Sequence, residues 1–211
     1  VYSRKQKRDL IAVSDYFKSA VVKFPFIEVP QHSLDAARGT KYRILYMSHL
    51  SYFKGFDLVL AIFNLLRGSC DQFELVVCNS GIMGDAQLLS DLADLEELFP
   101  NSIIIKGKVD PFVELASADI YLYPFKSLKG TFAFPFSFYE SLAMGTPFLG
   151  VAHDGLPDIF GGQFFIESTD SNQFVATFAD RITQLRGMSE SAVSGLVGDG
   201  LKNVRDYYAV Q

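Results

Sequence analysis

From Lys41 onward, short apolar runs alternate with segments whose apolar residues recur at helical spacing. The apolar runs are hydrophobic on both faces, which is typical of strands in a parallel sheet that helices cover on both sides. Such strands are joined by helices that cross over the sheet. We expect strands at residues 42–48, 73–79, 102–106, 119–123, 147–152 and 163–166.

Helical periodicity fills the segments between these strands. Residues 55–67 place Phe56, Val59, Leu60, Phe63 and Leu66 on one face, and residues 85–99 direct Leu88, Leu89, Leu92 and Leu95 inward before Pro100 stops the helix. Further helices are expected at residues 111–116, 137–145, 171–186 and 190–208. The alternation predicts an α/β fold: a doubly wound, mostly parallel, Rossmann-like sheet, whose ligands bind outside the carboxyl ends of the strands.

Residues 1–40 follow a different pattern. We expect a short strand at residues 9–13, a helix that Ser14 or Asp15 caps and that ends at Lys23, an extended segment at 26–29 and a polar linker at 30–40. One strand and one helix cannot bury a core by themselves. This segment is therefore expected to dock on the main domain, residues 41–211, or on a part of the protein outside the sequence.

Composition supports a globular domain and excludes some classes of partner. Hydrophobic residues make up 49% of the 211 residues and charged residues 20%, as in a protein with a well-filled core. A net charge of −5 argues against a nucleic-acid-binding protein. Cys70 and Cys78 fit neither a disulfide framework nor a metal site. We therefore expect both cysteines to pack as small apolar residues in or beside buried strands, in a protein of the reducing cytoplasm.

The membrane is a weaker candidate partner. No apolar run is long enough to span a bilayer. The basic residues Arg4, Lys5, Lys7 and Arg8 are interpreted as a solvated segment, with peripheral contact to an anionic membrane surface as the alternative.

The clearest ligand-binding signal lies between Phe134 and Gly150. A loop ends at Pro135 and Ser137, a short helix carries Glu140 in its first turn, and an apolar strand follows. This arrangement points a helix N-terminus at the carboxyl edge of the sheet, which suits an anionic ligand. The Glu140 carboxylate can accept hydrogen bonds from hydroxyl groups of the same ligand. We therefore expect phosphate and sugar in one pocket.

Several motifs occur in a fixed order along the chain. They are VP at 29–30 leading to Asp35, SHLSYFKG at 48–55, IKGKV at 105–109, ESLAMGTP at 140–147 and GLPD at 155–158. These motifs resemble the linker and the donor-binding, C-terminal lobe of the family 4 glycosyltransferases, which have the two-lobed GT-B architecture. The resemblance runs from about Leu10 to Tyr208. Residues 10–16 resemble the end of the acceptor lobe, so residues 1–40 are interpreted as a remnant of that lobe and the linker.

The resemblance implies roles for particular residues. Lys54 would contact the donor diphosphate, and Glu140 would accept hydrogen bonds from the ribose hydroxyls. Backbone amides near Ser137 and Phe138 would face the phosphates. Other donor-binding residues that it implies are Ser48 and His49 after the first strand, and Gly107 and Val109 beside the base.

Two positions depart from the family pattern. Phe132 stands where the family commonly has a glutamate that grips the donor sugar, and His49 stands where it has a phosphate-binding arginine. A neutral histidine supplies one hydrogen-bond donor, whereas the arginine guanidinium supplies a positive charge and paired N–H donors. Either donor affinity is weaker here, or another cation such as Lys129 takes over.

Structural interpretations compete with these roles. Ser137 and Glu140 have the spacing of a capping box, and Lys54 opens a helix against its dipole unless it meets a phosphate. His153 is expected to be structural or solvent-facing, and His32 to lie in the linker. The alternating phenylalanines at 132, 134, 136 and 138 are expected mainly to pack.

The resemblance implies a retaining transferase that moves a hexose from a nucleotide-diphosphate sugar to a hydroxyl acceptor. A metal ion is not predicted, because no Asp-x-Asp pair and no His or Cys cluster at metal-ligand spacing occurs. A nicotinamide cofactor is not expected, because no Gly-x-Gly-x-x-Gly follows the first strand. Full activity would need the acceptor lobe of the same enzyme, in the cytoplasm or at the inner face of the membrane. The alternative is a non-catalytic nucleotide-sugar-binding subunit or sensor. A receiver-type signalling domain is set aside, because Ser48 and Asn79 stand where clustered acids are needed.

Overall fold

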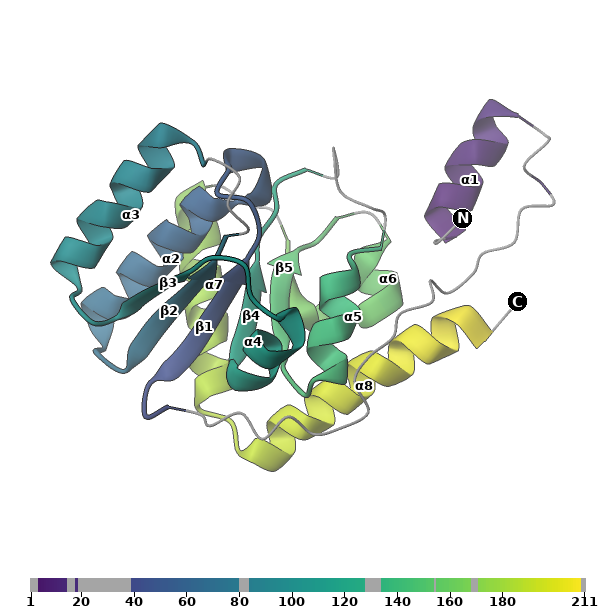
Figure 1. Ribbon diagram of the computed structural model, residues 1–211. Coiled ribbons are helices and arrows are strands. Elements are labelled where there is room, and N and C mark those ends of the chain that lie inside the picture. The colour runs from purple at the N-terminus through teal and green to yellow at the C-terminus, as the bar shows by residue number, and fades with distance from the viewer. Residues whose placement is uncertain are drawn as a thin grey trace.

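Six parallel strands form one sheet in the residues that the structure, a computed structural model, describes: 4–14, 18, 39–79, 84–127, 134–153, 155–167 and 171–209. The strands are β1 (Tyr42–Met47), β2 (Phe73–Cys78), β3 (Ile103–Lys106), β4 (Ile120–Tyr123), β5 (Phe148–Val151) and β6 (Phe165–Ile166). Their order is β3-β2-β1-β4-β5-β6, and every pairing is parallel (Figure 1). The order therefore reverses between β1 and β4, which is the topological switch point where doubly wound sheets bind ligands.

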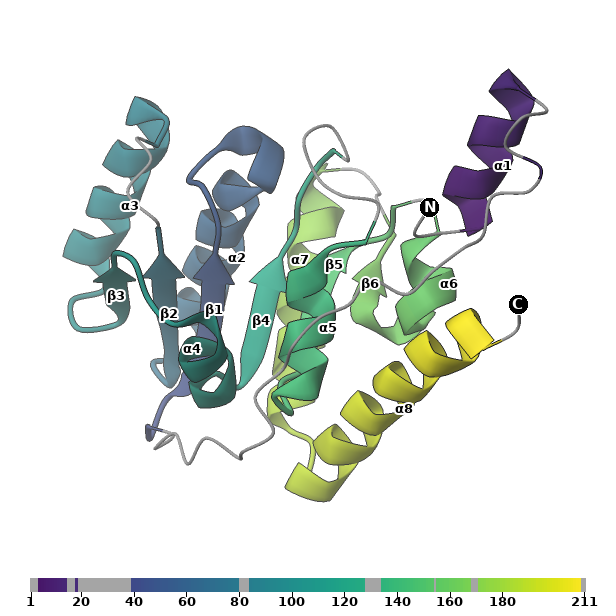
Figure 2. The ribbon, with the colours of Figure 1, turned by 45° about the vertical axis from the view of Figure 1, so that its right-hand side comes forward.

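Helices cover both faces of the sheet. Figures 1 and 2 show α2, α3 and α7 on one face and α4 and α5 on the other, while α8 runs across the lower end of α5 and α6. Their bounds are α2 (Phe56–Ser69), α3 (Ala86–Leu98), α4 (Pro111–Ser117), α5 (Phe136–Ala143), α6 (Leu156–Phe160), α7 (Ser171–Arg186) and α8 (Glu190–Ala209). The predicted Rossmann-like α/β fold is confirmed.

The core explains why the strands are apolar throughout. Every residue of β2, β4 and β5 is buried, because helices press on both sides. The helical face predicted for α2 is buried as expected. Aromatic rings fill the space between the sheet and α5: Phe138 stacks on Phe148 with ring centroids 4.0 Å apart, and Phe148 stacks on Phe164 at 4.8 Å. Stacked aromatic pairs add stability beyond the area that they bury.

Local capping sets the helix starts. The Asp85 side chain accepts a hydrogen bond from the Gln87 amide at the start of α3, and Asp110 does the same for Phe112 at the start of α4. Pro111 occupies the first turn of α4, where its missing N–H costs nothing. None of the helices in the described ranges is long and apolar enough to cross a membrane.

Three local predictions are wrong. Residues 9–13 are the second half of a helix, α1 (Arg4–Val13), because a short apolar run with no neighbouring strand to pair with does not specify a strand. Leu89 is 43% exposed, since the buried stripe of α3 is narrower than its run of leucines. Ser137 lies inside α5 and does not cap it. The helix predicted to end at Lys23, the segment at 26–29 and the linker at 30–40 fall mostly or wholly outside the described residues.

The two ends of the described chain meet. The Arg4 amide donates to the Tyr207 hydroxyl at 2.7 Å, and the Arg4 guanidinium donates to the Tyr207 carbonyl at 3.0 Å. The same guanidinium lies 4.6 Å from the centroid of the Tyr207 ring. These contacts attach α1 to the end of α8 (Figure 2).

Candidate functional site

A cavity of about 310 Å³ lies at the carboxyl ends of β1, β2 and β3. Its lining comes from three strand ends: Met47, Ser48 and His49 after β1, Cys78 at the end of β2, and Gly107, Lys108, Val109 and Pro111 between β3 and α4. Four residues predicted to bind the donor, namely Ser48, His49, Gly107 and Val109, therefore meet in one cavity.

Hydrogen bonds hold the β1 side of this cavity in place. The Tyr46 hydroxyl donates to the His49 carbonyl at 2.7 Å, and the Ser51 amide donates to the same oxygen at 2.9 Å. The His49 side chain itself is exposed. On the opposite wall, a Cβ atom built on Gly107 would meet no other atom within 4 Å. Gly107 therefore borders open space on this wall of the cavity.

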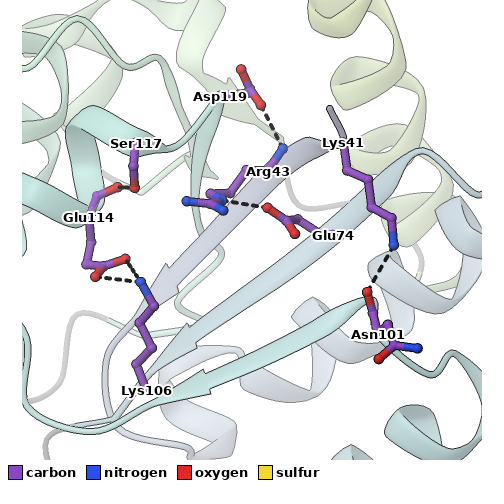
Figure 3. A network of polar contacts seen from close by, with 8 residues as sticks. All are labelled: Lys41, Arg43, Glu74, Asn101, Lys106, Glu114, Ser117 and Asp119. Atoms are coloured by element: carbon purple, nitrogen blue, oxygen red, sulfur yellow. Dashed lines mark hydrogen bonds and ion pairs between the residues drawn. The ribbon is translucent and has the colours of Figure 1, made fainter. Parts of the chain in front are cut away.

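An ion pair that sequence reasoning missed supports the β3 side. Lys106 Nζ lies 2.7 Å from both carboxylate oxygens of Glu114, which is only 7% exposed (Figure 3). The pair joins the end of β3 to α4 and so fixes the Gly107–Pro111 loop between them. No sequence signal marked it, because the pairing depends on the path of that loop.

Cys78 is a packing residue of the cavity floor. Burial, followed by the nearby Glu114 charge, raises the pKa of the Cys78 thiol to about 11. The thiol therefore stays protonated at neutral pH, and only a thiolate is strongly nucleophilic. Covalent catalysis by Cys78 is not supported.

Lys54 lies at the switch point between β1 and β4. It ends a 3-10 helix, η2 (Tyr52–Lys54), and Gly55 follows with φ 72°. A Cβ atom on Gly55 would lie 2.0 Å from the Pro124 carbonyl oxygen, so only glycine lets this turn approach the end of β4. Lys54 Nζ is 5.9 Å from the centroid of the Tyr123 ring. Lys54 thus precedes α2, which begins at Phe56, and does not open that helix as predicted.

The N-terminus of α5 differs from the predicted capping box. Pro135 is the N-cap residue and makes no side-chain cap. The Ser137 hydroxyl instead accepts a hydrogen bond from the Tyr121 hydroxyl at 3.2 Å. Burial keeps the pKa of Tyr121 above its ordinary value, so this phenol remains a donor that needs a partner. The tertiary contact therefore takes the serine that the local pattern assigned to the cap.

Phe138 belongs to the core. Its side chain is fully buried, and its amide donates to the Pro135 carbonyl at 3.1 Å. The Phe138 amide is therefore already bound within the first turn. Of the amides of Ser137 and Phe138, which were both expected to face a phosphate, only that of Ser137 remains for one. The first amides of a helix have no acceptor inside it.

Glu140 is half-buried, and no described residue donates a hydrogen bond to its carboxylate or forms an ion pair with it. Burial raises its pKa above the ordinary value. An unpartnered carboxylate in this setting is unfavourable unless a ligand supplies donors.

A row of tyrosines on β4 connects the two ends of this site. Tyr121, which feels the charge of Glu140, stacks on Tyr123 with centroids 5.9 Å apart, and Lys54 lies over Tyr123. Lys54, Ser137 and Glu140 are therefore grouped along β4 at the switch point. None of the three lines the cavity, but the Tyr121 hydroxyl lies 3.5 Å from the carbonyl of Met47, which does.

Some predicted residues contribute differently or are not described. His153 packs: its ring stacks on Phe125 at 4.7 Å, and Nε2 lies 2.6 Å from the Phe125 carbonyl oxygen. Lys129, Phe132 and His32 lie outside the described residues. Among the residues that are described, no group of three or more His, Cys, Asp or Glu side chains is placed to hold a metal ion.

Comparison with known families decides the assignment. The family model described as "Glycosyl transferases group 1" matches residues 41–185, from the start of β1 almost to the end of α7. The chain belongs to this glycosyltransferase family. The resemblance predicted from the motifs is confirmed, and no sequence among the curated proteins matches the chain.

Solved glycosyltransferases of GT-B architecture share the fold. The pneumococcal O-GlcNAc transferase GtfA, in complex with UDP and GlcNAc, superposes with a TM-score of 0.68 at 16% identity, over 98% of this chain and 41% of that one. An S. aureus TarM mutant, in complex with Fondaparinux, alpha-GlcNAc-glycerol and UDP, superposes with a TM-score of 0.72 at 15% sequence identity, over 99% of this chain and 40% of that one. Anabaena Alr3699/HepE, in complex with UDP-glucose, superposes with a TM-score of 0.63 at 12% sequence identity, over 80% of this chain and 45% of that one. This glycosyltransferase chain spans less than half the length of each.

Proposed function

We propose that residues 41–211 are the donor-binding lobe of a retaining glycosyltransferase, which transfers a hexose from a nucleoside diphosphate sugar to a hydroxyl acceptor. The observation that carries the proposal is the cavity at the carboxyl ends of β1–β3, whose lining residue Met47 contacts the Tyr121 hydroxyl that donates to Ser137. The solved relatives that are bound to UDP or UDP-glucose support a uridine nucleotide.

Each part of the donor has a proposed position. The base enters the cavity beside Gly107 and Val109. The ribose hydroxyls donate to Glu140, whose carboxylate has no donor from the described chain. The diphosphate lies between the Lys54 ammonium and the N-terminus of α5, where the helix dipole favours negative charge.

The chemistry follows from these positions. The leaving diphosphate gains negative charge as the bond to the sugar breaks, and preorganised donors stabilise that charge. Lys54 and the α5 N-terminus are such donors. We propose that the departing phosphate takes the proton of the acceptor hydroxyl, without a side-chain base, and that no metal ion or other cofactor takes part.

The partner in catalysis is the acceptor lobe of the same enzyme, and we place the reaction in the cytoplasm or at the inner face of a membrane. Cys70 and Cys78 are free thiols, which agrees with a reducing compartment.

Calorimetric titration of the 211-residue chain with UDP tests the proposal. We expect binding, and at a hundred times Kd UDP should stabilise the fold by roughly 2.7 kcal/mol. Lys54→Met should weaken UDP binding by about tenfold, because it removes a charge-assisted contact. Lys202→Met is the matched control, since Lys202 is exposed on α8. Absence of binding by the wild-type chain to any nucleoside diphosphate would overturn the proposal.

A non-catalytic nucleotide-sugar-binding subunit is the second candidate. The exposed His49 favours it, because a neutral imidazole at the cavity gives less charge for a diphosphate than an arginine. Donor hydrolysis or transfer by the longer protein, lost in Glu140→Ala, would decide for the enzyme.

A further inference from the structure

A second lysine, Lys126, stands on the segment that is bound to the Lys54 turn at the switch point. Lys126 follows β4, and its backbone amide donates to the Phe53 carbonyl at 3.0 Å. This bond ties the segment after β4 to η2, the turn that carries Lys54. The close approach of Gly55 to the Pro124 carbonyl holds the same two segments together. Lys126 and Lys54 are thus attached to one rigid junction between β1 and β4.

The Lys126 ammonium is paired, yet it remains within reach of solvent. It contacts Asp57 Oδ2 and lies 5.9 Å from the centroid of the Tyr52 ring. The Lys126 side chain is 40% exposed. The ammonium has three N–H donors, so it can bind a further acceptor while it contacts Asp57. An ion pair as exposed as the Lys126–Asp57 pair adds little to the stability of the fold.

Asp57 is only partly satisfied by this pair. Its second oxygen, Oδ1, is buried, and no donor in the described chain reaches it. Asp57 stands in the first turn of α2, where the helix dipole stabilises a carboxylate without any cation. The helix dipole therefore offsets part of the cost to Asp57 of releasing Lys126.

We propose that Lys126 is a second diphosphate-binding cation, which Asp57 holds in the free domain and releases to the donor. The inference rests on the proposed function, and it names the cation that offsets the neutral His49. Contacts between an ammonium and a phosphate oxygen are charge-assisted and stronger than an exposed ion pair. The flexible stem of lysine allows the ammonium to move from Asp57 to a phosphate.

The two partners of the pair should have opposite effects. By calorimetry on the 211-residue chain, Lys126→Met should weaken UDP binding by about tenfold, while Asp57→Asn, which removes the competitor, should strengthen it by about threefold. Uridine, which lacks the phosphates, should bind both variants and the wild type equally. Lys126→Arg should keep most of the UDP affinity.

Two controls separate this mechanism from simpler ones. If the pair only supported the fold, both variants would shift UDP binding in the same direction. If Asp57 acted only by its general charge, Asp91→Asn would strengthen binding equally, since Asp91 also lies within electrostatic range of Tyr52. In the double variant Asp57→Asn with Lys126→Met, the gain from Asp57→Asn should vanish.

The outcomes separate this inference from the proposed function. Failure of the wild-type chain to bind UDP or any other nucleoside diphosphate overturns both. Wild-type binding with unchanged affinity in Lys126→Met, or with no gain in Asp57→Asn, overturns the role of Lys126 and leaves the donor site standing. The role of Lys126 is also overturned if Asp57→Asn strengthens UDP binding as much in the Lys126→Met variant as it does in the wild type.

Discussion

The two edges of the sheet satisfy their polar groups differently. At the amino edge, Arg43 Nε lies 2.6 Å from Glu74 Oε1, and the Arg43 amide donates to Asp119 at 2.7 Å (Figure 3). Lys41 Nζ donates to the Asn101 carbonyl at 3.0 Å. At the carboxyl edge, Glu140 has no partner among the described residues, and Asp57 has one unpaired buried oxygen.

Cavity size alone would favour the amino edge over the proposed donor site. A cavity of about 530 Å³ lies at the amino edge, between the strand starts and the α7–α8 connection. Two of its charged residues are engaged, since Asp119 binds the Arg43 amide and Arg186 contacts Gln72. The amino edge is not free of unmet groups, since Arg67 Nε in the last turn of α2 is also buried without a partner in the described chain. The two edges therefore differ in their carboxylates, which are paired at the amino edge and incompletely paired at the carboxyl edge.

The largest expected effect comes from the junction at the carboxyl edge. Gly55→Ala places a methyl group against the Pro124 carbonyl at a positive φ. Chemical denaturation should show a loss of about 3 kcal/mol in the free energy of unfolding, and UDP binding should fall with it. Gly68→Ala on α2 is the control, because its Cβ would meet no atom within 4 Å. Equal stability of both variants would show that the junction is not tight.

At the amino edge, removal of a partner should affect stability alone. Glu74→Ala leaves Arg43, whose side chain is 19% exposed, without its carboxylate. The free energy of unfolding should fall by about 2 kcal/mol, because most of the pair is buried. The affinity for UDP, measured below the unfolding transition, should stay within about twofold of the wild type, since a stability effect away from the site leaves binding intact. A selective loss of affinity would break the contrast between the edges.

Glu140→Gln should show the converse pattern. UDP binding should weaken by about tenfold, as the acceptor for the ribose hydroxyls loses its charge. Stability at neutral pH should not fall. Burial raises the folded-state pKa of Glu140, so the folded protein loses stability as pH rises from the ordinary pKa through the raised one, and glutamine avoids that loss. Thermal unfolding of both proteins across this pH range checks the sign, and a clear destabilisation by Glu140→Gln would contradict it.

The smallest expected effect is the pH dependence of binding. If ionised Glu140 holds the ribose, the affinity for uridine should fall as pH drops through the raised pKa of Glu140. Uridine avoids titration of the phosphates. In Glu140→Gln this dependence should disappear, and a dependence that persists in the variant would assign it to another group.

Much of the fold was accessible from local pattern. The six strands, the buried face of α2 and the position of α3 follow from periodicity, which acts over a few neighbouring residues. Where local signals were ambiguous, prediction failed. Residues 9–13 and Leu89 show this, because an apolar run alone does not say which partner will bury it.

The candidate site was only partly accessible. Ser48, His49, Gly107 and Val109 were expected near one ligand, and the parallel order of β1–β3 brings them to one cavity. The Lys106–Glu114 pair could not be expected, because it depends on the path of a loop.

The sequence by itself determined the class of the domain and indicated the carboxyl edge as its candidate binding edge, because the alternation of apolar runs and helices leaves few other arrangements. Only the tertiary structure decided the partners of individual polar groups. Ser137 pairs with Tyr121, and Lys126 pairs with Asp57, 69 residues away in the chain. The physical reason is that these partners meet only in the folded sheet: α5 packs back on β4, and β1 and β4 become neighbours only where the sheet order reverses.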